Sequence, residues 1–120
     1  MLFSQRWASY TDAMPEYIEL ITTVERRDDA RRIAQALVEK RLAACVQLVG
    51  PIESVYRWQG KIETTQEWQC RAKTRRDRYD AVERAIREIH PYEVPEILAF
   101  PVVAGSADYL AWLDDAVASD

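Results

Sequence analysis

The sequence of 120 residues contains only two Cys, one His and three Gly. With so few Cys and His residues, the chain cannot form a metal cluster of the zinc-finger type. Cys45 and Cys70 lie in apolar, strand-like segments, where an unpaired Cys behaves as a small hydrophobic residue. We therefore expect free thiols, no disulfide and a reducing compartment, the cytoplasm. A domain of this length buries roughly two-thirds of its extended surface, so a conventional core is possible without such cross-links.

The sequence also lacks long apolar runs. None approaches the ~20 residues that span a bilayer, which argues against an integral membrane protein. Residues 1–15 have no basic head, apolar stretch and small-residue cleavage site of a secretory signal. We expect residues 1–15 to be a flexible N-terminal extension and residues 16–120 to form a single domain.

The charge balance is acidic. Twenty Asp and Glu against sixteen Lys and Arg give a formal net charge of −4, which does not favour nucleic acid as a partner. Two Arg clusters precede predicted helices, but Asp28 and Asp29 follow the first cluster and Asp77 interrupts the second. At 48% hydrophobic and 30% charged residues, the composition is that of a globular protein rather than a disordered one.

The apolar periodicity predicts seven elements. Strands are expected at 16–24, 42–49 continuing to 58, 61–74 and 96–103, and helices at 28–39, 77–89 and from 106 onward. The run 42–49 is apolar on both faces, as in a central strand. Pro51 interrupts it and marks a bulge or an exposed edge, and Gln59-Gly60 marks a turn. This order of elements is typical of a ferredoxin-like fold with an added C-terminal helix.

Signals for helix ends are also present. Asp28 and Asp29 are expected to provide an N-cap and first-turn negative charge. Thr74-x-x-Asp77 has the pattern of a capping box, and His90-Pro91 is expected to end the helix that follows.

The two strands of the predicted hairpin are too long for the protomer. About 15 residues each at ~3.3 Å per residue reach roughly 50 Å, whereas a chain of this size is roughly 35 Å across. The hairpin must bend or project, and it carries Tyr56, Trp58 and Trp68. We expect another copy of the chain to cover these aromatic side chains, and therefore an obligate oligomer. Tyr79, Tyr109 and Trp112 are expected to pack inside the protomer.

The densest polar segment runs from His90 to Glu96. An imidazole with the carboxylates of Glu93 and Glu96 could hold copper or zinc, although weakly, because no thiolate is near. The alternative is that His90 caps a helix end and the acids pair with Arg side chains.

A second candidate site involves one strand face. Glu67, Arg71 and Lys73 share that face and could form a small-molecule or anion pocket with His90; a Lys73–Glu67 pair could also supply acid–base chemistry. Such alternating charges are more often a solvated face or an interface. The sequence has no phosphate-binding Gly loop and no nucleophile elbow, so we do not expect an enzyme.

Five motifs in order resemble those of the divalent-cation tolerance protein CutA family. They are Leu42-Ala-Ala-Cys-Val46, Ser54-x-Tyr56-x-Trp58-x-Gly60-Lys61, Glu67 with Lys73-Thr74, His90-Pro-Tyr92-Glu93-x-Pro95-Glu96, and Tyr109-Leu-x-Trp112-Leu113. The resemblance implies an α+β protomer, a ferredoxin-like βαββαβ two-layer sandwich, assembled as a trimer similar to the PII signalling proteins. It also implies metal-ligand roles for His90 and Glu96. Copper-linked members can carry a thiol where this chain has Thr22.

The leading functional hypothesis is a non-enzymatic homotrimer of the divalent-metal response. It would bind copper or a similar cation weakly at His90, Glu93 and Glu96 and need no obligatory cofactor. The alternative is a PII-like sensor that binds a small metabolite in a cleft between subunits. The residues expected to line that cleft are Trp58, Glu67, Lys73 and Tyr92.

Overall fold

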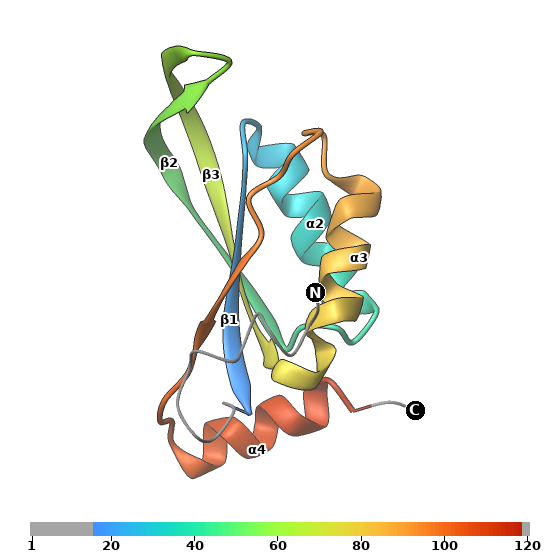
Figure 1. Cartoon of the computed structure of the whole chain (residues 1–120). Helices are drawn as coiled ribbons and strands as arrows, with labels where there is room; N and C mark the ends of the chain where they lie inside the picture. Colours follow the sequence, from blue (N-terminus) through green and yellow to red (C-terminus); the bar gives the residue numbers. More distant parts are fainter. Residues whose placement is uncertain (1–15, 119–120) are drawn as a thin grey trace.

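The computed structural model describes residues 16–118, which form four strands and three helices (Figure 1). In chain order these are β1 (Tyr17–Val24), α2 (Arg27–Glu39), β2 (Cys45–Trp58), β3 (Lys61–Arg75), the short 3-10 turn η1 (Arg76–Arg78), α3 (Tyr79–Ile89), β4 (Leu98–Pro101) and α4 (Ala107–Ala116). The predicted order of elements is confirmed. The predicted extension 1–15 lies outside the described residues.

The strands form one antiparallel sheet in the order β2-β3-β1-β4. Strand β1 is central and pairs with β3 from Tyr17 opposite Arg75 to Val24 opposite Trp68. Helices α2 and α3 cover one face of this sheet, which makes a two-layer, ferredoxin-like arrangement (Figure 1).

The prediction that 42–49 is a central strand is wrong, because β2 lies at the sheet edge. Its apolar residues on the helix-covered face, Val46 and Leu48, pack against the core. On the other face Val49 is 38% exposed. The run is therefore apolar on both sides although only one side is covered by the protomer.

The core lies between the sheet and the two covering helices. Its largest fully buried side chains are Ile18, Leu20 and Val24 from β1, Ile33 and Leu37 from α2, and Val82 and Ile86 from α3. The strand residues alternate and the helix residues recur every three or four positions, so each element buries one face. Cys70 is buried in this core as a free thiol, and burial raises its pKa to about 12. Cys45 is also free, as predicted.

Two helix-start predictions need correction. The N-cap of α2 is Arg26, without a side-chain capping bond, and Asp28 and Asp29 lie in the first turn, where they still favour the helix dipole. The capping box at Thr74 is wrong. Strand β3 continues to Arg75, so the hydroxyl of Thr74 is used within the core, where it donates to the carbonyl oxygen of Leu42 at 2.6 Å.

Helix α4 lies across one end of the sheet, away from the hairpin tip (Figure 1). Ser106 caps it by accepting a hydrogen bond from the backbone N–H of Tyr109 at 3.3 Å. Leu113 is buried, but Tyr109 and Trp112 are 41% and 47% exposed. The prediction that both aromatics pack inside the protomer is therefore wrong, because only one narrow stripe of α4 reaches the sheet.

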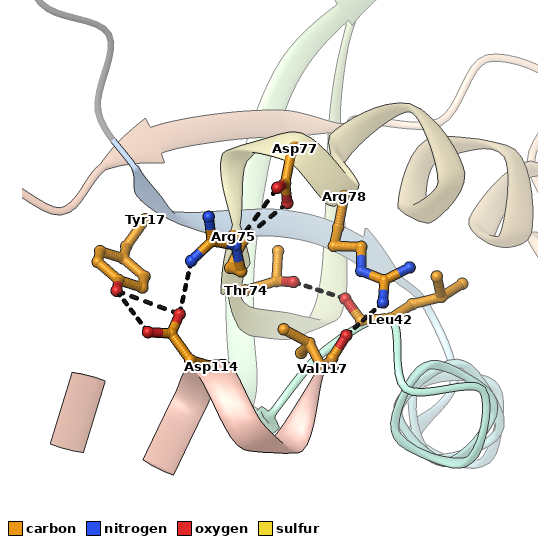
Figure 2. Close-up of polar contacts among 8 residues, drawn as sticks. All are labelled: Tyr17, Leu42, Thr74, Arg75, Asp77, Arg78, Asp114 and Val117. Atoms are coloured by element: carbon orange, nitrogen blue, oxygen red, sulfur yellow. Dashed lines mark hydrogen bonds and ion pairs between the residues drawn. The ribbon is translucent and has the colours of Figure 1, made fainter. Parts of the chain in front are cut away.

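Polar contacts complete the attachment of α4 (Figure 2). Asp114 accepts hydrogen bonds from the hydroxyl of Tyr17 at 3.0 Å and from Nη1 of Arg75 at 2.6 Å. The guanidinium of Arg78 donates to the carbonyl oxygen of Val117. These contacts tie the last helix to β1, β3 and the start of α3.

The β2–β3 hairpin projects beyond the helices, as predicted (Figure 1). The described chain measures 43 × 32 × 25 Å along its principal axes. The turn residues Gln59 and Gly60 have φ of 51° and 81°, the left-handed conformation that a tight two-residue hairpin turn requires. The pairing register shifts between Val49 and Ile52, so Gly50 and Pro51 form the predicted irregularity on an edge strand.

Candidate functional site

A hollow of about 560 Å³ lies where the end of β1, the hairpin and the segment after α3 meet. It is lined by Thr23, Glu25, Ser54, Val55, Tyr56, Trp58, Glu67, Tyr92, Val94 and Glu96. Three of the four residues predicted to form a ligand cleft, namely Trp58, Glu67 and Tyr92, therefore do come together. Glu96, predicted as a metal ligand, lines the same hollow.

The carboxylate of Glu67 is the most buried acid in this hollow, with 7% of the residue exposed. The hydroxyl of Tyr92 donates a hydrogen bond to its Oε2 atom at 2.7 Å. Burial and this contact with Glu67 raise the pKa of Tyr92 well above its ordinary value. A Tyr hydroxyl is protonated at physiological pH even at its ordinary pKa of about 10, and this contact makes Tyr92 a hydrogen-bond donor to Glu67.

His90 holds the segment after α3 against β1. Its Nδ1 atom accepts a hydrogen bond from the backbone N–H of Tyr92 at 3.1 Å, and Nε2 lies 2.9 Å from the carbonyl oxygen of Thr23. A carbonyl oxygen only accepts, so Nε2 must carry the proton and the ring is neutral. Burial lowers the pKa of His90, which favours this neutral form.

Glu96 lies close to the same part of β1. Its Oε1 atom accepts a hydrogen bond from the hydroxyl of Thr23 at 3.4 Å, so His90 and Glu96 both contact this residue. Glu93 is exposed. Within residues 16–118, no group of three His, Cys, Asp or Glu side chains is placed to share a metal ion. Metal binding by His90, Glu93 and Glu96 stays a prediction, and it requires a rearrangement of His90.

Lys73, the fourth predicted cleft residue, does not line the hollow. It lies farther along the open face of the sheet, where Nζ donates to Oε1 of Gln47 at 2.5 Å and lies 3.8 Å from Oε2 of Glu19. Glu19 also pairs with Arg71, at 2.9 Å. These charges form their own cluster on the sheet face.

The hollow also contains residues that the sequence analysis did not single out as site residues. Thr23 and Glu25 lie at and just after the end of β1, and Ser54 shares a strand face with Tyr56 and Trp58. The alternation of Ser54, Tyr56 and Trp58 is the signal that could have identified Ser54.

The residues predicted for a subunit interface differ in exposure. Tyr56 is 41% exposed and Trp58 is 47% exposed. Trp68 packs against the protomer core, with the guanidinium of Arg27 5.6 Å from its ring centroid. The interface role of all three residues stays a prediction.

A family model described as the CutA1 divalent ion tolerance protein matches residues 18–116. The chain belongs to this family. The divalent-cation tolerance protein CutA of Thermus thermophilus is 44% identical over 94 residues, which cover 78% of this chain and 91% of the relative. Protein CutA of Mus musculus is 48% identical over 84 residues, covering 70% of this chain and 48% of the relative. The chain thus matches nearly all of the bacterial relative but about half of the mouse one.

Solved structures of the family share the fold. CutA1 from Shewanella sp. SIB1 superimposes with a TM-score of 0.84 at 42% identity, covering 88% of this chain and 98% of that chain. CutA from Xylella fastidiosa superimposes with a TM-score of 0.83 at 38% identity, covering 86% of this chain and 99% of that chain. These similarities confirm the predicted ferredoxin-like, PII-like fold of the protomer.

Proposed function

We propose that this chain is a divalent-cation tolerance protein that acts by binding rather than by catalysis, as a homotrimer in the cytoplasm. The observation that carries the proposal is the family match across residues 18–116. Within residues 16–118, no helix has the length and apolarity to cross a membrane. Among the relatives, one from rice is named chloroplastic and a structure from Archaeoglobus fulgidus is titled periplasmic. Because these relatives are named for different compartments, the cytoplasm is a proposal for this chain alone and is not carried over from the family.

Exposed apolar side chains support an oligomer. On the hairpin, Val55 and Ile62 are 65% and 62% exposed beside Tyr56 and Trp58. Leu98 and Phe100 of β4 and Tyr109 and Trp112 of α4 are also at least 41% exposed. Apolar surface of this extent is typical of interaction sites, and the edge strands β2 and β4 offer backbone groups to a neighbour.

The mass in solution tests the trimer. Light scattering should give three times the 13.9 kDa of the chain. The double variant Tyr56→Ser/Trp58→Ser should dissociate to smaller species. Val103→Ser, which alters a loop residue that is 86% exposed, should not. A parent chain that is monomeric at micromolar concentration would contradict the proposal.

For the cation, we propose weak binding of copper or a similar divalent ion by His90, Glu93 and Glu96. The shared contact of His90 and Glu96 with Thr23 supports their proximity. Imidazole and carboxylate are suitable ligands for copper and zinc. Binding must be weak because both ring nitrogens of His90 are already hydrogen-bonded, and each bond given up costs about 1 kcal/mol.

Calorimetric titration of the full chain with Cu²⁺ tests this site. Affinity should fall at least tenfold in His90→Ala and also in Glu96→Gln, a variant that preserves the side-chain shape. Glu88→Gln, an exposed carboxylate on α3, is the matched control and should bind as the parent does. If His90→Ala and Glu96→Gln both bind copper as tightly as the parent chain, the proposed ligands are wrong.

The alternative function, a PII-like metabolite sensor, is not favoured by the comparisons. The family model and the bacterial relatives carry names of divalent-cation tolerance. Lys73, the one cation of the predicted cleft, lies away from the hollow and is engaged with Gln47 and Glu19.

A further inference from the structure

The hollow beside β1 carries charge of one sign. Its lining includes the carboxylates of Glu25, Glu67 and Glu96, and no Lys, Arg or His side chain is among its lining residues. The remaining polar side-chain groups of its lining residues are the hydroxyls of Thr23, Ser54 and the two Tyr side chains and the indole N–H of Trp58. An anionic ligand would meet three carboxylates there without a compensating cation, so the hollow suits a cationic ligand.

Glu67 is the buried carboxylate with which such a cationic ligand would form an ion pair. It is more than nine-tenths buried, and within residues 16–118 its hydrogen-bond partner is the neutral hydroxyl of Tyr92. No cationic side chain of the described residues forms an ion pair with it. A buried carboxylate is ordinarily paired with a cation, because one neutral hydrogen bond does not replace its lost hydration.

The other walls of the hollow are aromatic. The side chains of Tyr56, Trp58 and Tyr92 line it, and nearly half of Trp58 is exposed. The faces of such rings attract ammonium groups, and the adjoining apolar surface accommodates the carbon body of an organic cation.

The size of the hollow favours an organic cation over a single metal ion. At about 560 Å³ it falls within the range of small-molecule pockets, roughly 300–1,000 Å³. Its carboxylates are not grouped closely enough for three of the described acidic side chains to share one ion. A ligand with an extended body can approach Glu67 and contact an aromatic wall at the same time.

We propose that this hollow binds an organic ammonium ion, with its charged nitrogen against Glu67 and its aliphatic body against Trp58. The inference goes beyond the proposed divalent-cation function, because an amine is a different ligand on different residues. It depends on the hollow and on Glu67, not on the ring nitrogens of His90.

Calorimetry on the full chain at fixed ionic strength tests it, with putrescine and tetramethylammonium as probes. Putrescine should bind, and 1,4-butanediol, a neutral molecule of the same length, should not. Glu67→Gln should weaken putrescine at least tenfold while keeping an acceptor for the Tyr92 hydroxyl. Glu53→Gln is the matched control, since Glu53 lies on the same hairpin outside the hollow and the change of net charge is identical. The affinity of Glu53→Gln for putrescine should stay within twofold of that of the parent chain.

Trp58→Leu provides a second variant, because this exposed side chain is not part of the core. Leu keeps an apolar side chain at the proposed subunit interface, so light scattering should still give the mass of the parent assembly. The Trp58→Leu variant should weaken both ammonium probes. The inference is overturned if neither probe binds the parent chain, or if Glu67→Gln and Glu53→Gln weaken binding equally. If Cu²⁺ binds through His90 while no ammonium binds, the inference fails and the proposed metal function stands. If an ammonium probe binds through Glu67 while Cu²⁺ does not bind through His90, the inference stands and the proposed metal site fails.

Discussion

Arg75 of β3 and Asp114 of α4 form an ion pair between the last helix and the sheet, with Nη1 2.6 Å from Oδ1 (Figure 2). The hydrogen bond from Arg75 lowers the pKa of Asp114 and raises that of the guanidinium. Among residues 107–118, Leu113 and Val117 are the deeply buried ones, so polar contacts add to a small apolar contact in the docking of α4.

We predict that Asp114→Asn loosens α4 without unfolding the core, because the core cluster contains no residue of this helix. Amide hydrogen exchange in 107–116 should become several-fold faster, and exchange in α2 should not change. Asp115→Asn, the exposed neighbour on the same helix, removes the same charge and should leave exchange unaltered. Equal effects of the two variants would show that the Arg75 contact does not hold the helix.

His90 should make the stability of the protomer depend on pH. Burial lowers its pKa in the folded state, while in the unfolded chain the value is about 6.5. Below that pH the unfolded state binds the additional proton, so stability is complete above about 6.5 and falls as the pH drops toward the folded pKa. A proton on Nδ1 also removes the acceptor for the Tyr92 N–H.

Denaturant unfolding between pH 7.5 and 5 should show this decline, and His90→Gln should reduce it. His90 is the single His of the chain, so NMR can follow its titration without ambiguity. A measured pKa at or above 6.5 would contradict the prediction.

Gly50 should not tolerate a side chain. A Cβ at this position would lie 2.8 Å from Cε3 of Trp68 and 3.2 Å from the carbonyl oxygen of Glu67. We expect Gly50→Ala to cost about 1–3 kcal/mol in the free energy of unfolding, as for other overpacked sites. Gly60→Asn, at a left-handed turn residue with no neighbour within 4 Å, should cost less. If both variants unfold at the same denaturant concentration as the parent, the indole ring of Trp68 moves aside without a loss of stability and the prediction is wrong.

The hydroxyl of Thr74 should contribute to the stability of the fold. Thr74→Val keeps the shape but leaves the carbonyl oxygen of Leu42 without its 2.6 Å donor, and we expect a loss of about 1–2 kcal/mol. Thr64→Val on the exposed part of β3 is the matched control and should be nearly neutral. Chemical denaturation of the two variants gives the comparison, and similar values for both would argue against the role of this bond.

The order of strands and helices was predictable because each element buries one face. Local patterns predicted the turn at Gln59-Gly60, the end of α3 at His90 and the irregularity at Pro51. The errors arose where a distant partner decides the outcome. The hydroxyl of Thr74 donates a hydrogen bond to Leu42, 32 residues away, and does not cap a helix. Helix α4 contacts the sheet along too narrow a stripe to bury Tyr109.

The candidate site was only partly predictable for the same reason. Glu67 and Lys73 share a strand face, but six residues of extended chain separate them by roughly 20 Å, too far for one small pocket. Trp58 and Tyr92 could be assigned to the site from their motifs. Their meeting with Thr23 depends on the pairing of β1 with β3 and on the bonds of His90.

The central position of β1 has a consequence for synthesis on the ribosome. This strand emerges before both of its partners, since Tyr17 pairs with Arg75 and Ile18 pairs with Pro101. Its two edges therefore stay unpaired until most of the chain has been made, and closure of the sheet awaits the last strand. Such distant pairings slow folding and leave a nascent apolar strand exposed. Slower translation between residues 24 and 61 should therefore increase aggregation of the nascent chain.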